Sequence, residues 1–251
     1  MKATPKQQLA LLEMQDCDTR LARLSYDSQH LPQNEQIMEL RGKQDELTRT
    51  LAQSQAARND AQRALKKLDS DIEKTTARLK VQQERQEAGL GDLRELNTRA
   101  EEIATLEKRI SDLEEEHFDL ESEVEQLEAG IAQTETSLSE LSSQVSDLHE
   151  QRDNELADLK SQAQPLIDRR KAAMQVAGEE LTREYDEIRK STGGIGAVAL
   201  HGRQVEGMTI QFSATEWERI RTAPVDELVC SDDFEWILVR IHDQDGNEVI
   251  A

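Results

Sequence analysis

An alternating spacing of three and four residues between apolar side chains runs through most of residues 33–176, and this pattern constrains the fold more than any other feature. Such a repeat places apolar side chains in one stripe along a helix, which is typical of a coiled coil. On the first half it occupies positions 37 to 82, at Ile37, Leu40, Leu47, Leu51, Ala61, Leu65, Leu68, Ile72 and Leu79. Polar residues interrupt it at Gln44, Ser54, Arg58, Thr75 and Gln82.

A turn is predicted at residues 87–92, because Gly89 and Gly91 interrupt the repeat there and Asp92 suits the N-cap of a second helix. The repeat then resumes at Leu93, Leu96, Ile103, Leu106, Ile110, Leu113, Leu120, Val124, Leu127, Ile131, Leu138, Leu141, Val145 and Leu148. We therefore predict a long antiparallel coiled-coil hairpin.

The charges of the two arms favour this pairing. Residues 41–86 carry eleven basic and seven acidic side chains, whereas residues 101–150 carry two basic and sixteen acidic ones. A mildly basic arm facing a strongly acidic arm favours closure within one chain. Each ion pair contributes only tenths of a kcal/mol, so we expect the apolar stripe to drive the pairing.

Helices are also predicted on both sides of the hairpin. Residues 8–29 form an amphipathic helix that ends before Leu31-Pro32, and chain length places it beside residues 150–172. A short helix follows at residues 179–190. We therefore assign residues 1–190 to a helical domain. Cys17 is expected to pack as a small apolar side chain.

Composition narrows the class of protein. Hydrophobic residues make up 36%, aromatic residues 3% and charged residues 33% of the 251 residues, which suits an elongated helical chain. The net charge of −21 disfavours binding to phosphate backbones or anionic membranes. The sequence shows no membrane span, signal peptide or disulfide framework, so we expect a cytoplasmic protein.

Residues 191–251 differ in composition and are predicted to form a small β-rich domain after a flexible glycine turn at residues 193–196. Strands are expected at 197–201, 209–212, 228–229, 236–241 and 248–250, the last after an Asp245-Gly246 turn. Ser213 and Glu216 have the spacing of a capping box that opens a helix through Arg221.

Four short sequences in this region carry a resemblance: Gly-Gly-Ile-Gly-Ala at 193–197, Gly-Arg-Gln-Val-Glu-Gly-Met at 202–208, Ser-Ala-Thr-Glu-Trp-Glu-Arg-Ile-Arg at 213–221 and Trp-Ile-Leu-Val-Arg at 236–240. With the preceding hairpin, the chain resembles the bacterial zinc-ribbon family with an N-terminal coiled-coil hairpin, close to its actinobacterial branch. The resemblance implies that two Cys-x-x-Cys pairs would hold one zinc ion.

The ligand positions that the resemblance implies hold no cysteine here. They are occupied by Val205, Met208, Ser231 and Phe234, and Cys230 lies one position before the third. Structural zinc needs four thiolate or imidazole ligands, so we expect a zinc-free, degenerate ribbon with Val205, Met208 and Phe234 in a small hydrophobic core. A substitute site at Cys230, His201, His242 and a carboxylate is the weaker alternative.

The resemblance implies a non-enzymatic adaptor, because the relatives bind proteins that include an alternative sigma factor and secretion or flagellar components. Candidate contacts to unidentified cytoplasmic proteins are Trp217, Trp236, Arg219 and Arg221, although a place in the core of the ribbon is the favoured alternative for both tryptophans. Nucleic-acid binding is the alternative, disfavoured because residues 197–251 carry four arginines and eleven acidic residues. We expect no catalytic residue and no cofactor; open helix faces allow a homodimer.

Overall fold

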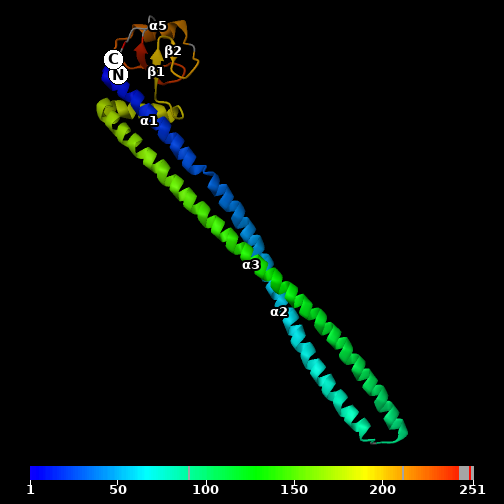
Figure 1. Cartoon of the computed structure of the whole chain (residues 1–251). Helices are drawn as coiled ribbons and strands as arrows, with labels where there is room; N and C mark the ends of the chain where they lie inside the picture. The colour runs from blue at the N-terminus through cyan, green and yellow to red at the C-terminus, as the bar shows by residue number, and fades with distance from the viewer. Residues whose placement is uncertain (90, 211, 243–248, 250–251) are drawn as a thin grey trace. The chain divides into compact units, whose positions relative to one another are not determined.

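The structure is a computed structural model that describes residues 1–89, 91–210, 212–242 and 249, without the side chain of His242 (Figure 1). The chain divides into two compact units. The first unit combines residues 1–34 with residues 151–251, and the second consists of residues 35–150. Among the described residues, no helix is both long enough and apolar enough to cross a membrane.

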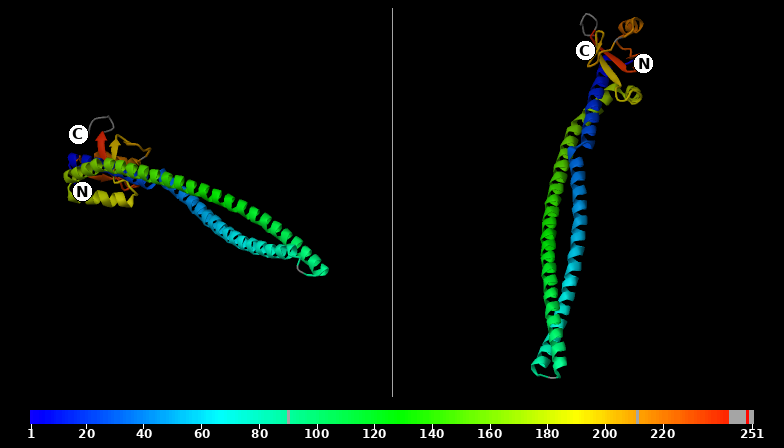
Figure 2. Two further views of the ribbon diagram at one scale, coloured as in Figure 1. Left: turned by 60° about the horizontal axis from the view of Figure 1, so that its bottom comes forward. Right: turned by 90° about the vertical axis from the view of Figure 1, so that its right-hand side faces the viewer.

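The second unit is an antiparallel helical hairpin. Helix α2 (Pro32–Glu87) and helix α3 (Leu93–Ala177) run side by side in it (Figure 2). Side-chain hydrogen bonds join the helices at several levels, and the residue number falls on α3 as it rises on α2. These bonds are Arg41–His149 at 3.1 Å, Gln62–Glu128 at 3.3 Å, Asp69–His117 at 2.9 Å and Gln83–Glu107 at 3.4 Å. The predicted coiled-coil hairpin is confirmed.

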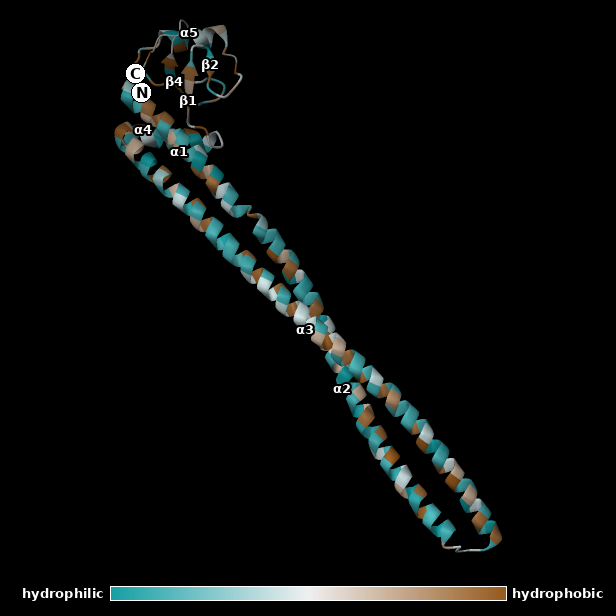
Figure 3. Cartoon of the chain, viewed as in Figure 1, coloured by the Kyte–Doolittle hydropathy of each residue, from teal (hydrophilic) through white to brown (hydrophobic). Residues whose placement is uncertain are grey.

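The predicted stripe forms the seam of the hairpin. Every position of the α2 repeat from 37 to 82, polar ones included, is buried or half-buried. Apolar colour recurs along both helices in Figure 3. On α3 the predicted apolar positions are also buried or half-buried except Leu93, whose placement in the seam was wrong. Leu93 is 77% exposed, because it is the first residue of α3 and has no facing turn of α2.

The turn between the two helices closes as its residue types predict. Gly89 and Gly91 have φ angles of 62° and 120°, a backbone region that residues other than glycine rarely adopt. The Asp92 carboxylate accepts hydrogen bonds from the backbone N–H groups of Arg94 and Glu95, at 3.0 and 2.8 Å. Glu95 accepts one in return from the Asp92 backbone, which completes a capping box.

The first unit begins with helix α1 (Pro5–Gln29), which is longer than predicted. Thr4 and Gln7 form a capping box at its start, and Pro5 occupies the first turn, where its missing N–H costs nothing. Helix α3 ends at Ala177, and Gly178, with φ 88°, leads into helix α4 (Glu179–Ser191). The short helix predicted at residues 179–190 is confirmed.

A four-stranded sheet completes this unit, with strand order β2-β1-β4-β3. Its strands are β1 (Ala197–His201), β2 (Gln204–Val205), β3 (Val229–Cys230) and β4 (Ile237–His242); helix α5 (Ala214–Thr222) follows β2. β1 pairs with β4 in parallel, and both appear strongly apolar in Figure 3.

One predicted strand of the sheet is wrong. The second strand does not begin at Thr209. It begins at Gln204, because Gly202, with φ 59°, turns the chain immediately after β1. The turn predicted at 245–246 lies outside the described residues. Of the predicted strand 248–250, only Val249 is described, and it donates to the carbonyl of Ile241 at 2.9 Å.

Two hydrophobic cores lie against this sheet. The first, which we call the α1-side core, joins both ends of the chain and consists of Ala3, Ala10, Leu11, Met14, Ala173, Ala177, Leu181, Tyr185, Ala197, Ile237 and Val239. The second, the α5-side core, consists of Val198, Leu200, Val205, Phe212, Trp217, Ile220, Val229 and Leu238. The predicted domain boundary lies at residues 190–191. The compact units are divided elsewhere, because α1 shares a core with the sheet and belongs to the same unit.

Candidate functional site

The four residues at the positions of the family's zinc-binding cysteines do not pack together into one hydrophobic cluster. Val205 is buried in the α5-side core, and Met208 packs against it. Ser231 is buried, and its hydroxyl group donates to the Glu216 carboxylate at 3.2 Å. Phe234 is 39% exposed, so its predicted place in the core was wrong. It points outward because it lies in the turn between β3 and β4, which we call the 231–236 loop.

Glu216 has a different partner from the one its spacing predicted. Ser213 accepts from the Glu216 backbone N–H at 3.1 Å, as in a capping box. The Glu216 side chain does not return to the helix start. It is 96% buried and accepts hydrogen bonds from the Ser231 hydroxyl and the Asp232 backbone. The helix cap is confirmed, but the second half of the box is wrong because the carboxylate anchors the 231–236 loop.

The two tryptophans have different environments. Trp217 is only 8% exposed and belongs to the α5-side core, with the Arg203 guanidinium 5.4 Å from its ring centre. This burial removes Trp217 from the candidate partner contacts. Trp236 is half-buried, and the Phe234 ring stacks on it with ring centres 4.7 Å apart and an angle of 18° between the planes.

Arg219 and Arg221, the two arginines predicted to contact a partner, form hydrogen bonds and ion pairs within residues 197–242, which we call the sheet module. Arg219 donates to the Cys230 carbonyl at 2.8 Å and to the Asp232 carboxylate at 2.7 Å, so it holds the 231–236 loop to α5. Arg221 pairs with Glu218 one turn earlier on the same helix, at 2.6 Å. Both remain about half exposed, with side-chain exposures of 45% and 53%. The 231–236 loop, in turn, combines exposed side chains with a backbone that these contacts hold in place.

The donor set does not fit a zinc ion. The four ligand positions offer two apolar side chains, an aromatic ring and a hydroxyl group, whereas structural zinc is held by thiolates and imidazoles. Among the described residues, no group of three or more His, Cys, Asp or Glu side chains is arranged to hold a metal. Cys230 packs beside the α1-side core, and burial raises the pKa of its thiol. The His242 side chain lies outside the described residues.

We predict that the protein purified without added metal contains far less than one zinc ion per chain. The reason is the missing thiolate donors, and the measurement is elemental analysis of the purified chain against its protein concentration. A Cys230→Ser variant is the control, because any zinc bound through the substitute site should fall with loss of this thiol. About one zinc per chain would contradict the prediction.

A buried polar cluster holds α1 against α3 and α4, and we call it the Asp18 cluster. Asp18 is 95% buried, which is unusual for a carboxylate. Its carboxylate accepts from Arg170 at 2.7 Å and from the Tyr185 hydroxyl at 3.0 Å, and lies 3.5 Å from Arg189. Burial first, and then the Asp18 charge, raise the pKa of Tyr185. The cluster buries a carboxylate together with the cations that neutralise it.

The glycine turn before β1 is held in place by a side chain of α1. The Gln15 amide donates to the Gly194 carbonyl at 3.0 Å, and its oxygen accepts from the Gly196 backbone at 2.7 Å and from the Tyr185 hydroxyl at 3.2 Å. The glycine pattern of residues 193–196 predicts a flexible turn. The structure corrects that interpretation, because Gln15 pairs the backbone groups that a hinge would leave to water.

Replacing Gly196 with alanine should destabilise this unit by about 1–3 kcal/mol through overpacking. A Cβ atom at this position would lie 2.5 Å from Cε2 of Tyr185, whose side chain is fully buried. Denaturant unfolding followed by tryptophan fluorescence measures the change. Gly42→Ala is the control, since no atom lies within 4 Å of a Cβ there and alanine favours a helix. Equal stability of Gly196→Ala and the parent chain would refute the close contact.

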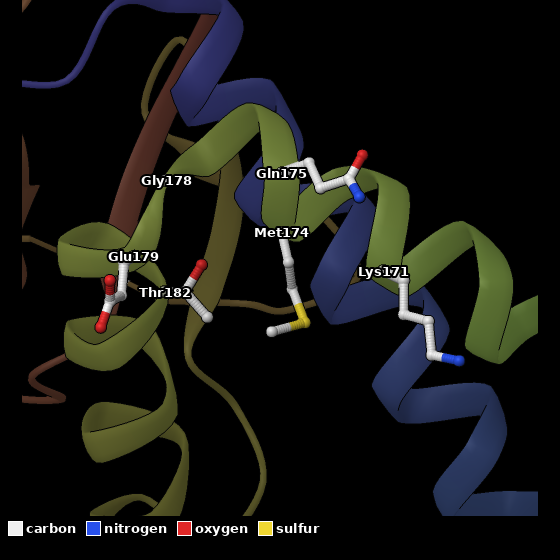
Figure 4. A pocket seen from close by; sticks show the side chains of 6 residues that line it. All are labelled: Lys171, Met174, Gln175, Gly178, Glu179 and Thr182. Carbon is white, nitrogen blue, oxygen red and sulfur yellow. The ribbon is translucent and has the colours of Figure 1, made fainter.

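A shallow groove lies where α3 passes into α4 (Figure 4). Its volume is ≈ 490 Å³, and it is lined by Lys171, Met174, Gln175, Gly178, Glu179 and Thr182. Met174 and Thr182 extend from the two helices into this space (Figure 4), and the Thr182 hydroxyl has no hydrogen-bond partner among the described residues. The Thr182 hydroxyl is therefore not hydrogen-bonded to Glu179 or Lys171, and the groove does not show the paired nucleophile and base that are typical of a catalytic site.

The fold and these surfaces define a coiled-coil hairpin protein with a small sheet module. The model of the CT398-like coiled coil hairpin domain matches residues 14–193, and the chain belongs to that family. A search of curated proteins found no match.

Two solved structures share the fold. A protein from Mycobacterium smegmatis is 26% identical, with a TM-score of 0.81 over 96% of this chain and 100% of its own. The CT398 protein from Chlamydia trachomatis is 17% identical, with a TM-score of 0.67 over 93% of this chain and 97% of its own. The second likeness concerns the fold alone.

Proposed function

We propose that this protein is a non-enzymatic adaptor that binds another protein through the 231–236 loop of its metal-free, ribbon-like C-terminal module. The observation that carries this proposal is the Phe234–Trp236 stack, which exposes an aromatic ring on an ordered loop. Aromatic side chains are enriched at the centres of protein interfaces, because they bury a large area with few rotatable bonds. The loop offers this surface without rearrangement.

The charge of the molecule supports a protein partner over nucleic acid. Residues 197–251 carry four arginines, no lysine and eleven acidic residues. The described arginines of this module are engaged within it: Arg203 lies over a ring, Arg219 and Arg221 pair with carboxylates, and Arg240 is buried. A phosphate backbone would meet an acidic surface with few available cations, which opposes binding.

Affinity capture with the immobilised full-length chain tests the adaptor role. The extract is divided, and one half is treated with nuclease before capture. We expect the same one or few proteins to be retained from both halves at physiological salt, and to be absent from bare resin. Retention that disappears after nuclease treatment, or no protein above the resin control, would contradict the proposal. A chain shortened at Lys190 is unsuitable, because it lacks the strands that complete the α1-side core.

A further inference from the structure

The exposed Phe234 is flanked in sequence by acidic residues. Asp232, Asp233 and Glu235 are its neighbours in the 231–236 loop, and all three are exposed. Asp232 pairs with Arg219. No described lysine, arginine or histidine lies within ion-pair distance of Asp233 or Glu235. A cation is attracted to the face of an aromatic ring, and it is also attracted to carboxylates that have no ion-pair partner. A surface that carries both groups therefore favours a positively charged ligand.

The loop that carries this surface is fixed from several sides. Ser231 donates its backbone N–H to the Trp236 carbonyl at 2.9 Å, and Glu235 donates to the Ser231 carbonyl at 3.0 Å. The buried Glu216 carboxylate and the Arg219 guanidinium hold the loop from α5. Glu235 has a φ of 62°, which is uncommon for a residue with a side chain. Binding here therefore requires little further ordering of the backbone, and less free energy is lost on association.

We propose that Phe234, Asp233 and Glu235 form a docking site for an arginine side chain in a basic segment of a partner protein. This proposal rests on the proposed adaptor function and names the chemistry of the partner. A guanidinium group stacks on an aromatic ring and donates several hydrogen bonds in its plane, so one arginine can contact the Phe234 ring and a neighbouring carboxylate together.

Charge complementarity selects this occupant. The chain has a net charge of −21, and the module that carries the loop is itself acidic. An acidic peptide, a phosphate group or an anionic lipid surface would be repelled there. A purely apolar partner segment would leave the carboxylates of Asp233 and Glu235 to be desolvated without a partner, which costs free energy.

The hairpin provides a matched control for this site. Phe118 on α3 is 70% exposed and follows Glu114, Glu115 and Glu116, so it also combines an aromatic ring with carboxylates. It lies on one face of a helix, without an aromatic residue stacked against it in the described part of the chain. General attraction of a basic peptide to an acidic protein should depend equally on both phenylalanines, whereas a specific site should depend on Phe234.

Fluorescence anisotropy with the full-length protein tests the proposal at 0.15 M salt. The probe is a labelled, capped peptide with three arginines separated by glycines, and the reference peptide carries citrulline, an uncharged analogue, in place of each arginine. We expect the arginine peptide to bind and the citrulline peptide not to bind. Phe234→Ala should weaken binding about tenfold, as the loss of one cation–π contact and its packing implies. Phe118→Ala should leave affinity unchanged within about twofold, the scatter expected of a surface change.

Two further variants separate the parts of the site. Phe234→Leu keeps an apolar side chain but removes the ring, and Asp233→Asn with Glu235→Gln removes the charges with little change in shape; both should also weaken binding. Circular dichroism spectra that match the parent chain show that each variant is folded. Undiminished binding in Phe234→Ala, equal losses in Phe234→Ala and Phe118→Ala, or no binding of the arginine peptide at all would overturn the proposal. A protein partner captured equally by the parent and Phe234→Ala chains would do so while leaving the adaptor role intact.

Discussion

Replacing Asp18 with alanine should lower the free energy of unfolding of the first unit by about 3–5 kcal/mol, the range for removing one member of a buried ion pair. The change removes one of the two carboxylates that pair with Arg170 at 2.7 Å and leaves the other, Asp186, although the Arg170 side chain is only 20% exposed. It also removes the nearer acceptor of the buried Tyr185 hydroxyl, at 3.0 Å, and leaves the Gln15 oxygen at 3.2 Å. Both losses act on the α1-side core, to which α1, α4 and the sheet contribute.

Tryptophan fluorescence during denaturant unfolding measures this effect, because both tryptophans, Trp217 and Trp236, lie in the sheet module. Asp16→Ala is the matched control on the same helix. Asp16 is 41% exposed and pairs with Arg20 one turn away, so its loss should cost less than about 1 kcal/mol. If the two variants unfold at the same denaturant concentration, the Asp18 cluster does not hold α1 to α3 and α4.

Replacing Arg240 with methionine should destabilise the sheet module by about 2–4 kcal/mol, because several backbone carbonyl groups lose a charged donor at once. Arg240 is 94% buried and donates to the carbonyls of Ile220, Ala223 and Pro224, at 3.1, 2.6 and 2.6 Å. These carbonyls lie at the end of α5, where the helix dipole favours a positive charge. Burial lowers the pKa of Arg240, yet an arginine remains protonated at neutral pH.

Arg221→Met provides the control for this prediction within the same module. Arg221 is 53% exposed and bonds only to Glu218 on its own helix among the described residues, so its replacement should change stability by less than about 0.5 kcal/mol. The measurement is again the unfolding transition seen by tryptophan fluorescence. Equal stability of the Arg240→Met and Arg221→Met chains would show that the carbonyls of α5 do not depend on Arg240.

The hairpin was predictable from sequence because its packing is local and periodic. One stripe of apolar residues at the spacing of a helical repeat specifies both the seam and the helix faces, and Asp92 follows the general rule for N-caps. The exposed position of Leu93 was missed because the repeat alone does not say where the facing helix ends.

The polar contacts of the first unit were not predictable in the same way. Gln15, Asp18 and Arg240 have partners far away in sequence or in an irregular turn, and no spacing rule relates them. Glu216 even has the spacing of a capping box, yet its carboxylate holds the 231–236 loop. Asp18 is buried on α1 together with Met14 and Cys17. Because buried polar groups are almost always hydrogen-bonded, a polar residue on the apolar face of a helix indicates that a partner lies elsewhere in the chain.

Site-specific photo-crosslinking in living cells tests the central claim, that this chain binds a protein through its 231–236 loop. A photoreactive phenylalanine derivative replaces either Phe234 or Phe118 in the full-length chain, since both side chains are exposed. The account predicts a discrete protein adduct from position 234 and a much weaker one, or none, from position 118. Adducts of equal yield from both positions, or adducts at 234 that consist of nucleic acid, would contradict it.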